Sequence, residues 1–360
     1  MSRVYNFRPG PAMLPLDVIE EVHRELIEFP GAGMSTLEIS HRTPVFQSMM
    51  DAAIAGMRRL ADIPPDYHIL FLGGGASLQF AMAPMNLMAA GATADYIVSG
   101  VWGKYALDEA NKIGKACVSA TTETERFARV PRNEDLKPTP GAAYVHMTSN
   151  NTDVGTQWTA LPDVGSTPLV SDMTSDIFSR PIPIERHALI YAGAQKNLGI
   201  AGVTLVIIHD DLLARSSPRL PTMLSYRAQA EHNSLYNTPP VFAIYILGRM
   251  IRWLLDRGGL QTVAECNARK AARLYAEIDR TGFYCGLAGR EDRSVMNVTF
   301  RLPTSELDTK FVASAAAEGL DGLAGHRSIG GIRASIYNAF PEDGVLALAG
   351  FMREFERTHG

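Results

Sequence analysis

The sequence predicts an α/β protein whose larger domain is built on a mostly parallel sheet, and three observations support this. Short apolar runs alternate with stretches of helical periodicity over residues 68–209. The last two runs, 187–192 and 203–209, are joined by a segment too short for a helical crossover. The chain has 360 residues, of which 46% are hydrophobic and 20% charged, so it can bury a large core.

The individual elements are predicted from periodicity. Near the N-terminus, Val18, Val22, Leu26 and Phe29 share one face of a helix. The predicted strands that follow are 68–72, 95–100, 142–147, 168–172, 187–192 and 203–209, with helical stretches at 79–90 and 104–114. Because alternation of this kind is typical of parallel sheets, we expect parallel neighbours, except for the last two strands, which should be antiparallel.

The pattern changes after residue 258. A long helical pattern over 260–280 precedes a strand-like run, 294–302, then a helix around 308–319 and a final helix. We therefore predict two domains: an N-terminal segment with a large domain over 1–258, and a small α+β domain over 259–360.

Charge and composition narrow the classes of function. The formal net charge of −4 gives no basis for wholesale binding to nucleic-acid phosphates. No run reaches the roughly 18 apolar residues of a membrane span, and the N-terminus lacks the apolar core of a signal peptide. Cys117, Cys266 and Cys285 are scattered, without metal-ligand spacing. We expect a cytoplasmic protein with small-molecule ligands and no bound metal, nucleic acid or membrane partner.

Lys196 is the first candidate for a chemical role. It lies between two predicted strands, among the small residues Ala192, Gly193, Ala194 and Gly199, which leave space for a ligand. A lysine held beside an apolar sheet has a lowered pKa, and its neutral amine is a nucleophile. An arbitrary lysine in a turn is usually just solvated, so the neighbouring residues decide whether Lys196 has a chemical role. A Schiff-base lysine is the natural use of this arrangement.

A pyridoxal phosphate site makes further demands, which the sequence meets. Asp172 closes a predicted strand, where a carboxylate can keep the ring nitrogen protonated, although such an Asp alone is more often a cap. The stretch GGGASLQF, from Gly73, places Ala76 and Ser77 at a helix start, where backbone N–H groups bind phosphate without a metal. Trp102 follows another strand and suits the face of the cofactor ring, although core packing would explain it as well.

Two His-Arg dipeptides indicate a site for a dianionic substrate. His41 and Arg42 form the first pair, His326 and Arg327 form the second, and Arg333 follows closely. In a chain of net negative charge, this clustering favours local anion binding. A single pair would more often be a surface coincidence.

Eight stretches resemble the class V aminotransferases of fold type I, and among them the group that acts on phosphoserine. They are NFRPGPAMLP, GGGASLQF, VSGVWGKYA, HMTSNNTDVGTQW, VSDMTSDIFSRPI, YAGAQKNLGIAGVTLVII, SLYNTPPVFAIY and GLAGHRSIGGIRASIYNAF. They span almost the whole chain in the expected order. The resemblance implies a mostly parallel seven-stranded sheet flanked by helices in the large domain, plus a small α+β C-terminal domain.

The resemblance also implies roles in binding pyridoxal 5'-phosphate. The implied cofactor contacts are Ala76, Ser77, Trp102, Thr152, Asp172, Gln195, Lys196, Asn237 and Thr238. Lys196 would bind the cofactor covalently, and Asp172 would pair with its ring nitrogen. Thr152 would contact the side of the phenolic oxygen. Asn237 and Thr238 would reach the cofactor of a second subunit, so the implied active unit is a homodimer with shared sites.

For the substrates, the resemblance implies that Arg333 holds the α-carboxylate, a role that suits its bidentate guanidinium. His41, Arg42, His326 and Arg327 would receive the distal phosphate or carboxylate, the first two from the partner chain. The implied reaction is the reversible exchange of an amino group between 3-phosphoserine and 2-oxoglutarate, giving 3-phosphooxypyruvate and glutamate, in serine biosynthesis. A second role in pyridoxine biosynthesis, with 4-phosphohydroxythreonine as substrate, stays open.

Three alternatives stay open from the residues alone. Another class V aminotransferase, acting on serine, alanine or glyoxylate, would have little use for two His-Arg pairs. A cysteine desulfurase needs a reactive cysteine in a mobile loop, and neither Cys266, on a helical pattern, nor Cys285 fits well. A cofactor-free binding or scaffold protein would not need the lysine, the strand-end Asp and the anion-binding residues together. The colour of the purified protein separates this last alternative from the first two.

Overall fold

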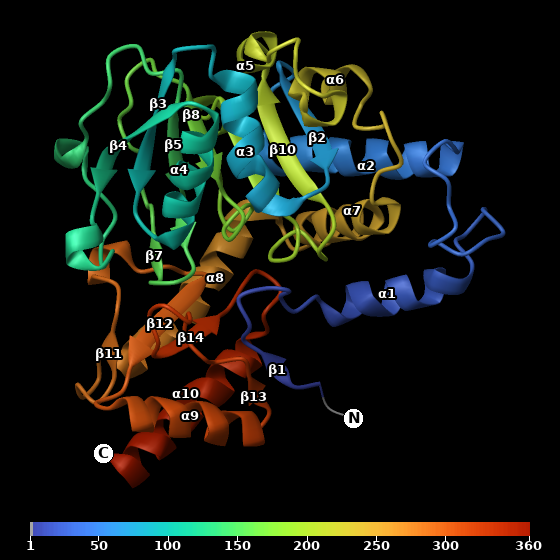
Figure 1. Ribbon diagram of the computed structural model, residues 1–360. Coiled ribbons are helices and arrows are strands. Elements are labelled where there is room, and N and C mark those ends of the chain that lie inside the picture. Colours follow the sequence, from blue (N-terminus) through green and yellow to red (C-terminus); the bar gives the residue numbers. More distant parts are fainter. Residues whose placement is uncertain (1–2) are drawn as a thin grey trace.

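The computed structural model describes residues 3–360 and contains the mostly parallel sheet that the alternating pattern predicts, with the seven strands that the resemblance implies (Figure 1). The strand order is β2-β10-β9-β8-β5-β3-β4. These strands are β2 (Tyr67–Leu72), β3 (Thr93–Val98), β4 (Lys115–Thr121), β5 (Val145–Thr148), β8 (Leu169–Asp172), β9 (Leu189–Gly193) and β10 (Thr204–His209). The non-consecutive order places the ends of β5 and β8 next to each other, near the middle of the sheet.

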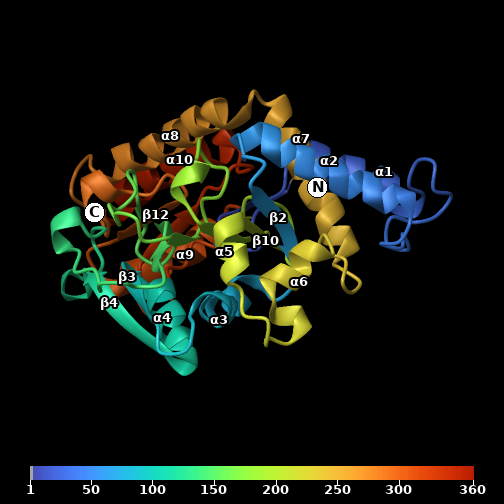
Figure 2. The same ribbon diagram turned by 90° about the horizontal axis from the view of Figure 1, so that it is seen from above.

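Helices cover both faces of this sheet, as the view from above shows (Figure 2). The helices are α1 (Leu16–Ile27), α2 (Pro44–Ala61), α3 (Gly75–Leu87), α4 (Val101–Ile113), α5 (Asp210–Arg215), α6 (Tyr226–Glu231), α7 (Val241–Asp256), α8 (Gly259–Ile278), α9 (Ser305–Ala317) and α10 (Glu342–His359). In β10, Leu205 and Ile207 pack with residues of α2 and α7, whereas Val206 and Ile208 pack with α3 and α4. Burial on both faces explains the uninterrupted apolar run of this strand.

The direction of β10 confirms the expectation for the last two predicted strands. β10 runs antiparallel to β2 and to β9, and the other neighbouring pairs of this sheet are parallel. Gly193 pairs with Thr204, and the N–H of Ala194 donates to the carbonyl of Val203 at 3.0 Å. Lys196 therefore lies in the short connection between two antiparallel neighbours, β9 and β10, the third and second strands in the sheet order.

Some elements differ from the sequence prediction. β3 ends at Val98, before the predicted limit of 100, and β5 begins at Val145 rather than at 142. The edge strand β4 has no counterpart among the predicted strands. Lys115 and Val118 are exposed, because one edge of β4 pairs with nothing in the sheet order, so the strand carries no continuous apolar run.

A second core gathers the C-terminal residues below the large sheet in Figure 1. Its three-stranded sheet has the order β11-β12-β14, and a separate pair joins β1 to β13. The strands outside the large sheet are β1 (Tyr5–Asn6), β6 (Asn150–Asn151), β7 (Thr156–Gln157), β11 (Cys285–Gly286), β12 (Asn297–Arg301), β13 (Leu320–Asp321) and β14 (Ile332–Ser335). Phe7 is buried in this second core, so the N-terminal segment packs with the C-terminal residues.

Helix α8 connects the two cores. Leu260 and Val263, near its start, pack in the core beneath the large sheet, while Leu274 and Ile278 pack in the second core. A division of the chain at residue 258 stays a proposal.

Helix α1 packs on α7, where Glu25 pairs with Arg249, and the connection between α1 and α2 projects outward in Figure 1. Within residues 3–360, none of the helices has the length and apolarity that crossing a membrane requires.

Candidate active site

A cavity of about 720 Å³ opens at the carboxyl ends of β5 and β8. This is the edge at which parallel sheets place ligands. The cavity lining includes nine of the predicted site residues: Ala76, Ser77, Trp102, Thr152, Asp172, Gln195, Lys196, His326 and Arg333. Elements far apart in the sequence thus converge on one space, from the start of α3 to the strand β14.

Lys196 reaches into this cavity from the β9–β10 connection. Its Nζ lies 5.9 Å from the centroid of the Trp102 ring. Burial lowers the pKa of Lys196 to about 8, and the negative charge of Asp172 opposes this shift. The amine is therefore neutral far more often than that of a solvated lysine, which makes it a nucleophile and a proton carrier.

The N-terminal segment packs directly on the lysine. Gly10 has φ +144°, and a Cβ placed there would lie 3.5 Å from Cγ of Lys196. The N–H of Ala12 donates to the carbonyl of Gln195 at 2.9 Å. That distance is an ordinary van der Waals contact, but the positive φ of Gly10 is one that larger residues rarely adopt, so glycine lets this segment pack against Lys196.

Asp172 is the last residue of β8 and is buried at the cavity wall. Its Oδ1 accepts a hydrogen bond from the backbone N–H of Thr174 at 2.9 Å. Burial raises the pKa of Asp172, while the hydrogen bonds from Thr174 and the charge of Lys196 act in the other direction. A carboxylate in this position can bind a protonated ring nitrogen.

The start of helix α3 forms an anion-binding end of the cavity. Gly74 and Gly75 adopt left-handed backbone, with φ of +86° and +67°. A Cβ on Gly74 would lie 2.5 Å from Cδ2 of Leu78. Ala76 and Ser77 line the cavity, and the first turn carries no acidic residue. The unpaired backbone N–H groups of a first helical turn can therefore bind a phosphate here.

Thr152 links two walls of the cavity. Its hydroxyl accepts a hydrogen bond from Nε1 of Trp102 at 3.0 Å, and its carbonyl accepts one from Nη1 of Arg333 at 3.0 Å. The neighbouring Asp153 accepts from the N–H of Val101 at 3.1 Å, at the start of α4. One short segment thus fixes both the indole ring and the guanidinium.

Arg333 makes the other end of the cavity positive, and His326 lines the same cavity. Arg333 comes from β14 and is 7% exposed, and its buried Nε has no hydrogen-bond partner within residues 3–360. Burial lowers the pKa of both residues. Nδ1 of His326 is paired with the hydroxyl of Ser328 at 2.7 Å. An anionic group would satisfy the unpaired guanidinium nitrogen.

The donor set of the cavity fits pyridoxal 5'-phosphate. The amine of Lys196 suits its aldehyde, and the carboxylate of Asp172 suits its ring nitrogen. The indole of Trp102 suits the face of its ring. The glycine turn before α3 leaves open space, because a Cβ on Gly75 would meet no atom within 4 Å. The phosphate can therefore approach the backbone closely.

Five predicted residues do not line the cavity of this single chain: His41, Arg42, Asn237, Thr238 and Arg327. Asn237 and Thr238 line a separate cavity of about 520 Å³, next to the same glycine turn. His41 and Arg42 lie in the connection between α1 and α2, just before α2 begins, and Arg327 is exposed. The roles of the first four concern a second subunit, so they stay predictions.

The cavity also contains residues that the sequence analysis did not single out. They are Pro9, Gly10, Pro11, Gly74, Gly75, Phe80, Thr148, Asn150, Thr174, Ser175, Ala201, Gly202 and Val203. Thr148 is the last residue of β5, Asn150 begins β6 two residues later, and Thr174 and Ser175 follow β8 within three residues. The rule that ligands bind at the carboxyl ends of parallel strands is the signal that could have found these four.

The fold and this site define a pyridoxal-phosphate-dependent enzyme of fold type I. Residues 4–348 match the family described as aminotransferase class V. The phosphoserine aminotransferase of Desulfosudis oleivorans is 50% identical over 361 residues, covering 100% of this chain and 99% of the relative.

Solved structures agree with this likeness. The phosphoserine aminotransferase from Bacillus circulans subsp. alkalophilus has a TM-score of 0.98 at 47% identity, covering 99% of each chain. A phosphoserine aminotransferase with bound pyridoxal phosphate, from Trichomonas vaginalis, has a TM-score of 0.94 at 37% identity, covering 98% of this chain and 100% of the other. The chain belongs to the phosphoserine aminotransferase family, within the class V aminotransferases.

Proposed function

We propose that this chain catalyses the reversible transfer of an amino group between 3-phosphoserine and 2-oxoglutarate, giving 3-phosphooxypyruvate and glutamate. The observation that carries the proposal is one cavity with Lys196 and Asp172 on one side and Arg333 and His326 on another. Its relatives, with half of their residues identical over the whole length, carry the name of this activity. The product would serve serine biosynthesis.

The chain's own residues supply binding and proton transfer. Bound pyridoxal 5'-phosphate supplies a reactive aldehyde and a ring that accepts an electron pair from the substrate Cα. Lys196 carries a proton at Nζ away from that carbon, a task that suits its pKa of about 8. Asp172 holds a proton on the ring nitrogen, and Trp102 holds the ring from its face.

The substrates have anionic groups at both ends, which the cations of the cavity suit. Arg333 would bind the α-carboxylate through its guanidinium. His326 lies beside it, and since burial lowers its pKa below the ordinary value, its ring would donate a hydrogen bond as a neutral group near neutral pH. The positive charge for a distal phosphate would come from Arg42 and Arg327, and His41 would add a further contact.

The active unit we propose is a homodimer. His41 and Arg42 lie in the connection between α1 and α2 and do not line the cavity of their own chain, so they could complete the site of a second copy. Asn237 and Thr238 border the glycine turn from the other side and would contact the second copy's cofactor phosphate. The proposed location is the cytoplasm, which three free thiols fit.

A comparison of amino donors tests the proposal. The visible absorbance of the purified holoenzyme is followed after addition of phosphoserine, glutamate, serine or alanine. Phosphoserine and glutamate should each change the spectrum, and serine and alanine should not at the same concentrations. A response to serine or alanine equal to that of phosphoserine would favour another class V aminotransferase. A separate titration with 4-phosphohydroxythreonine tests the role in pyridoxine biosynthesis.

A further inference from the structure

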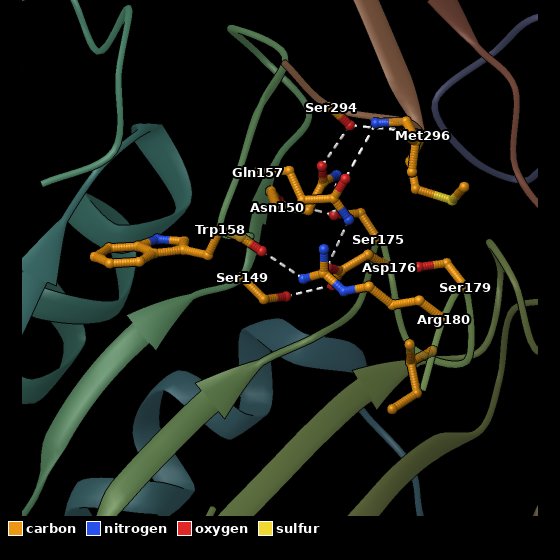
Figure 3. Close-up of polar contacts among 12 residues, drawn as sticks. Ser149, Asn150, Gln157, Trp158, Ser175, Asp176, Ser179, Arg180, Ser294 and Met296 are labelled. Atoms are coloured by element: carbon orange, nitrogen blue, oxygen red, sulfur yellow. Dashed lines mark hydrogen bonds and ion pairs between the residues drawn. The ribbon is translucent and has the colours of Figure 1, made fainter. Parts of the chain in front are cut away.

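Asn150 lies at the junction of the two cores, and the cofactor contacts described above do not account for it. Its side-chain nitrogen donates to Oγ of Ser175 at 2.8 Å and to Oδ1 of Asn297 at 2.8 Å. Its side-chain oxygen accepts from the hydroxyl of Ser294 at 2.5 Å. Figure 3 shows Asn150 between Ser175 and Ser294. One amide therefore joins the turn after β8 to β12 and the residues just before it.

Asn297 continues these contacts to the strand that carries Arg333. Its side-chain nitrogen donates to Oγ of Ser335 at 2.9 Å and to the hydroxyl of Tyr337 at 3.3 Å. Asn297 and Ser335 also pair across β12 and β14. Because Ser335 and Arg333 belong to the same short strand, this contact of Asn297 is one of the supports of the strand that carries the guanidinium.

On the side of the large sheet, Ser149, the residue before Asn150, is hydrogen-bonded to Asp172. Both the N–H and the hydroxyl of Ser149 donate to the carbonyl of Asp172 at 3.0 Å. The carboxylate of Asp176 accepts from the amide of Gln157 at 3.0 Å (Figure 3). The same Gln157 accepts from the N–H of Val295 at 3.1 Å. The segment from Asp172 to Asp176 is thus held to the strand β12 region at two places.

The side chains around Asn150 are buried, and their polar atoms have hydrogen-bond partners within residues 3–360. Asn150 is 1% exposed, Ser175 is 4% exposed, and Ser294 and Asn297 are 0% exposed. Hydrogen bonds have a defined length and direction, so they fix the relative position of two cores, which an apolar contact would leave free to slide. Loss of one member leaves buried polar partners without hydrogen bonds.

We propose that Asn150 is a positioning residue that aligns Arg333, on β14, with the lysine and aspartate on the large sheet. It acts through Asn297 and Ser335 on the arginine that would bind the substrate carboxylate. This inference rests on the proposed function, because the carboxylate-binding role of Arg333 belongs to that function. Asn150 sets the distance between two groups that must contact one substrate at once.

A double-mutant cycle on the holoenzyme tests this role. The variants are Asn150→Ala, Asn297→Ala and the double variant, and the measurements are KM and kcat with phosphoserine and glutamate, and the Kd of 2-oxoglutarate. Each single variant should raise KM and Kd about tenfold, and the double variant should also raise them about tenfold, since both remove the same connection. In Asn297→Ala, whose side chain does not line the cavity, the visible absorbance of the cofactor and its dependence on pH should stay as in the wild type.

Two further variants separate positioning from folding. Asn86 is a matched control, since it is 2% exposed and donates to the carbonyls of Met82 and Leu224 at 2.8 Å, away from this junction. Asn86→Ala should lower the melting temperature without changing KM. Ser335→Ala removes a single contact and should raise KM about threefold, which keeps the test usable if the Asn150 variant does not fold.

Three results would overturn the proposal. They are an unchanged KM in both Asn150→Ala and Ser335→Ala, multiplicative effects in the double variant, or a change in the cofactor spectrum of Asn297→Ala that accompanies its change in KM. The wild type is the check on the proposed function itself. If wild-type protein does not react with phosphoserine, the proposed function fails, whatever the ratios between variants and wild type show.

Discussion

Arg333 donates through Nη1 to the carbonyl oxygen of Thr152 at 3.0 Å. The hydroxyl of the same Thr152 accepts a hydrogen bond from the indole N–H of Trp102. Thr152 therefore holds both the guanidinium of Arg333 and the ring of Trp102. A change at either partner should therefore affect both walls of the cavity.

Replacement of Arg333 by lysine should weaken substrate binding strongly. A lysine keeps the charge but cannot contact a carboxylate with two parallel N–H groups and also reach the carbonyl of Thr152. We expect KM for phosphoserine and glutamate to rise about 10- to 100-fold in Arg333→Lys, equivalent to about 1.4–2.7 kcal/mol. Steady-state kinetics measure this, and a KM within twofold of wild type would refute the assigned role.

Replacement of Thr152 by valine should loosen Trp102. The variant keeps the shape of the side chain but removes the acceptor for the indole N–H, at a cost of about 1 kcal/mol. We expect the affinity for pyridoxal phosphate to fall several-fold in Thr152→Val. The control is Thr152→Ser, which retains the hydroxyl and should bind the cofactor nearly as wild type does. Equal affinities of the valine and serine variants would show that the hydroxyl is not needed.

The lowered pKa of Lys196 has a consequence for pH dependence. Only the neutral amine attacks an aldehyde, so covalent capture of the cofactor by stripped protein should accelerate as pH rises through about 8. At pH 8 about half of the amine is neutral, against roughly 0.3% for a lysine with a pKa of 10.5. The charge of Asp172 raises the pKa of Lys196, so Asp172→Asn should move the midpoint to lower pH. Stopped-flow absorbance measures the midpoint, and a wild-type value near 10.5 would contradict the burial described here.

The glycine turn before α3 offers a matched pair of substitutions. Gly74→Ala should strain the left-handed backbone by roughly 1–2 kcal/mol and push against Leu78, which shifts the first turn of the helix. We expect cofactor affinity and thermal stability to fall. In contrast, a Cβ on Gly73 would meet no atom within 4 Å, so Gly73→Ala should change both little. Calorimetry and cofactor titration measure the stability and the cofactor affinity of both variants. Equal losses in Gly74→Ala and Gly73→Ala would refute the argument from backbone conformation.

Local signals account for what the sequence predicted well. The apolar runs of the buried strands, the strand-end position of Asp172 and the small residues around Lys196 are all read from neighbouring residues. The antiparallel direction of β10 followed from the short connection that carries the lysine. The sequence did not predict the edge strand β4, because its exposed residues leave it without an apolar run.

The missing parts of the site depend on contacts that no short stretch of sequence reveals. Gly10 packs on Lys196, and Asn150 contacts Asn297, although neither pair is close in sequence. The pairing of β1 with β13, which draws the N-terminus to the C-terminal core, is also of this kind. Residue types such as Asn and Gly are common in turns, so only the folded arrangement distinguishes these from ordinary loop residues.

The most direct test of the central claim is to find which lysine carries the cofactor. Lys270 is the sharpest internal competitor, because it is buried and burial lowers its pKa to about 8 as well. Its Nζ, however, donates to the carbonyls of Ile336 and Tyr337 at 3.0 and 2.7 Å, outside the cavity. Borohydride reduction of the yellow holoenzyme, followed by peptide mass spectrometry, should place pyridoxyl phosphate on Lys196 alone. A label on Lys270, or no label on Lys196, would contradict the assignment of the active site.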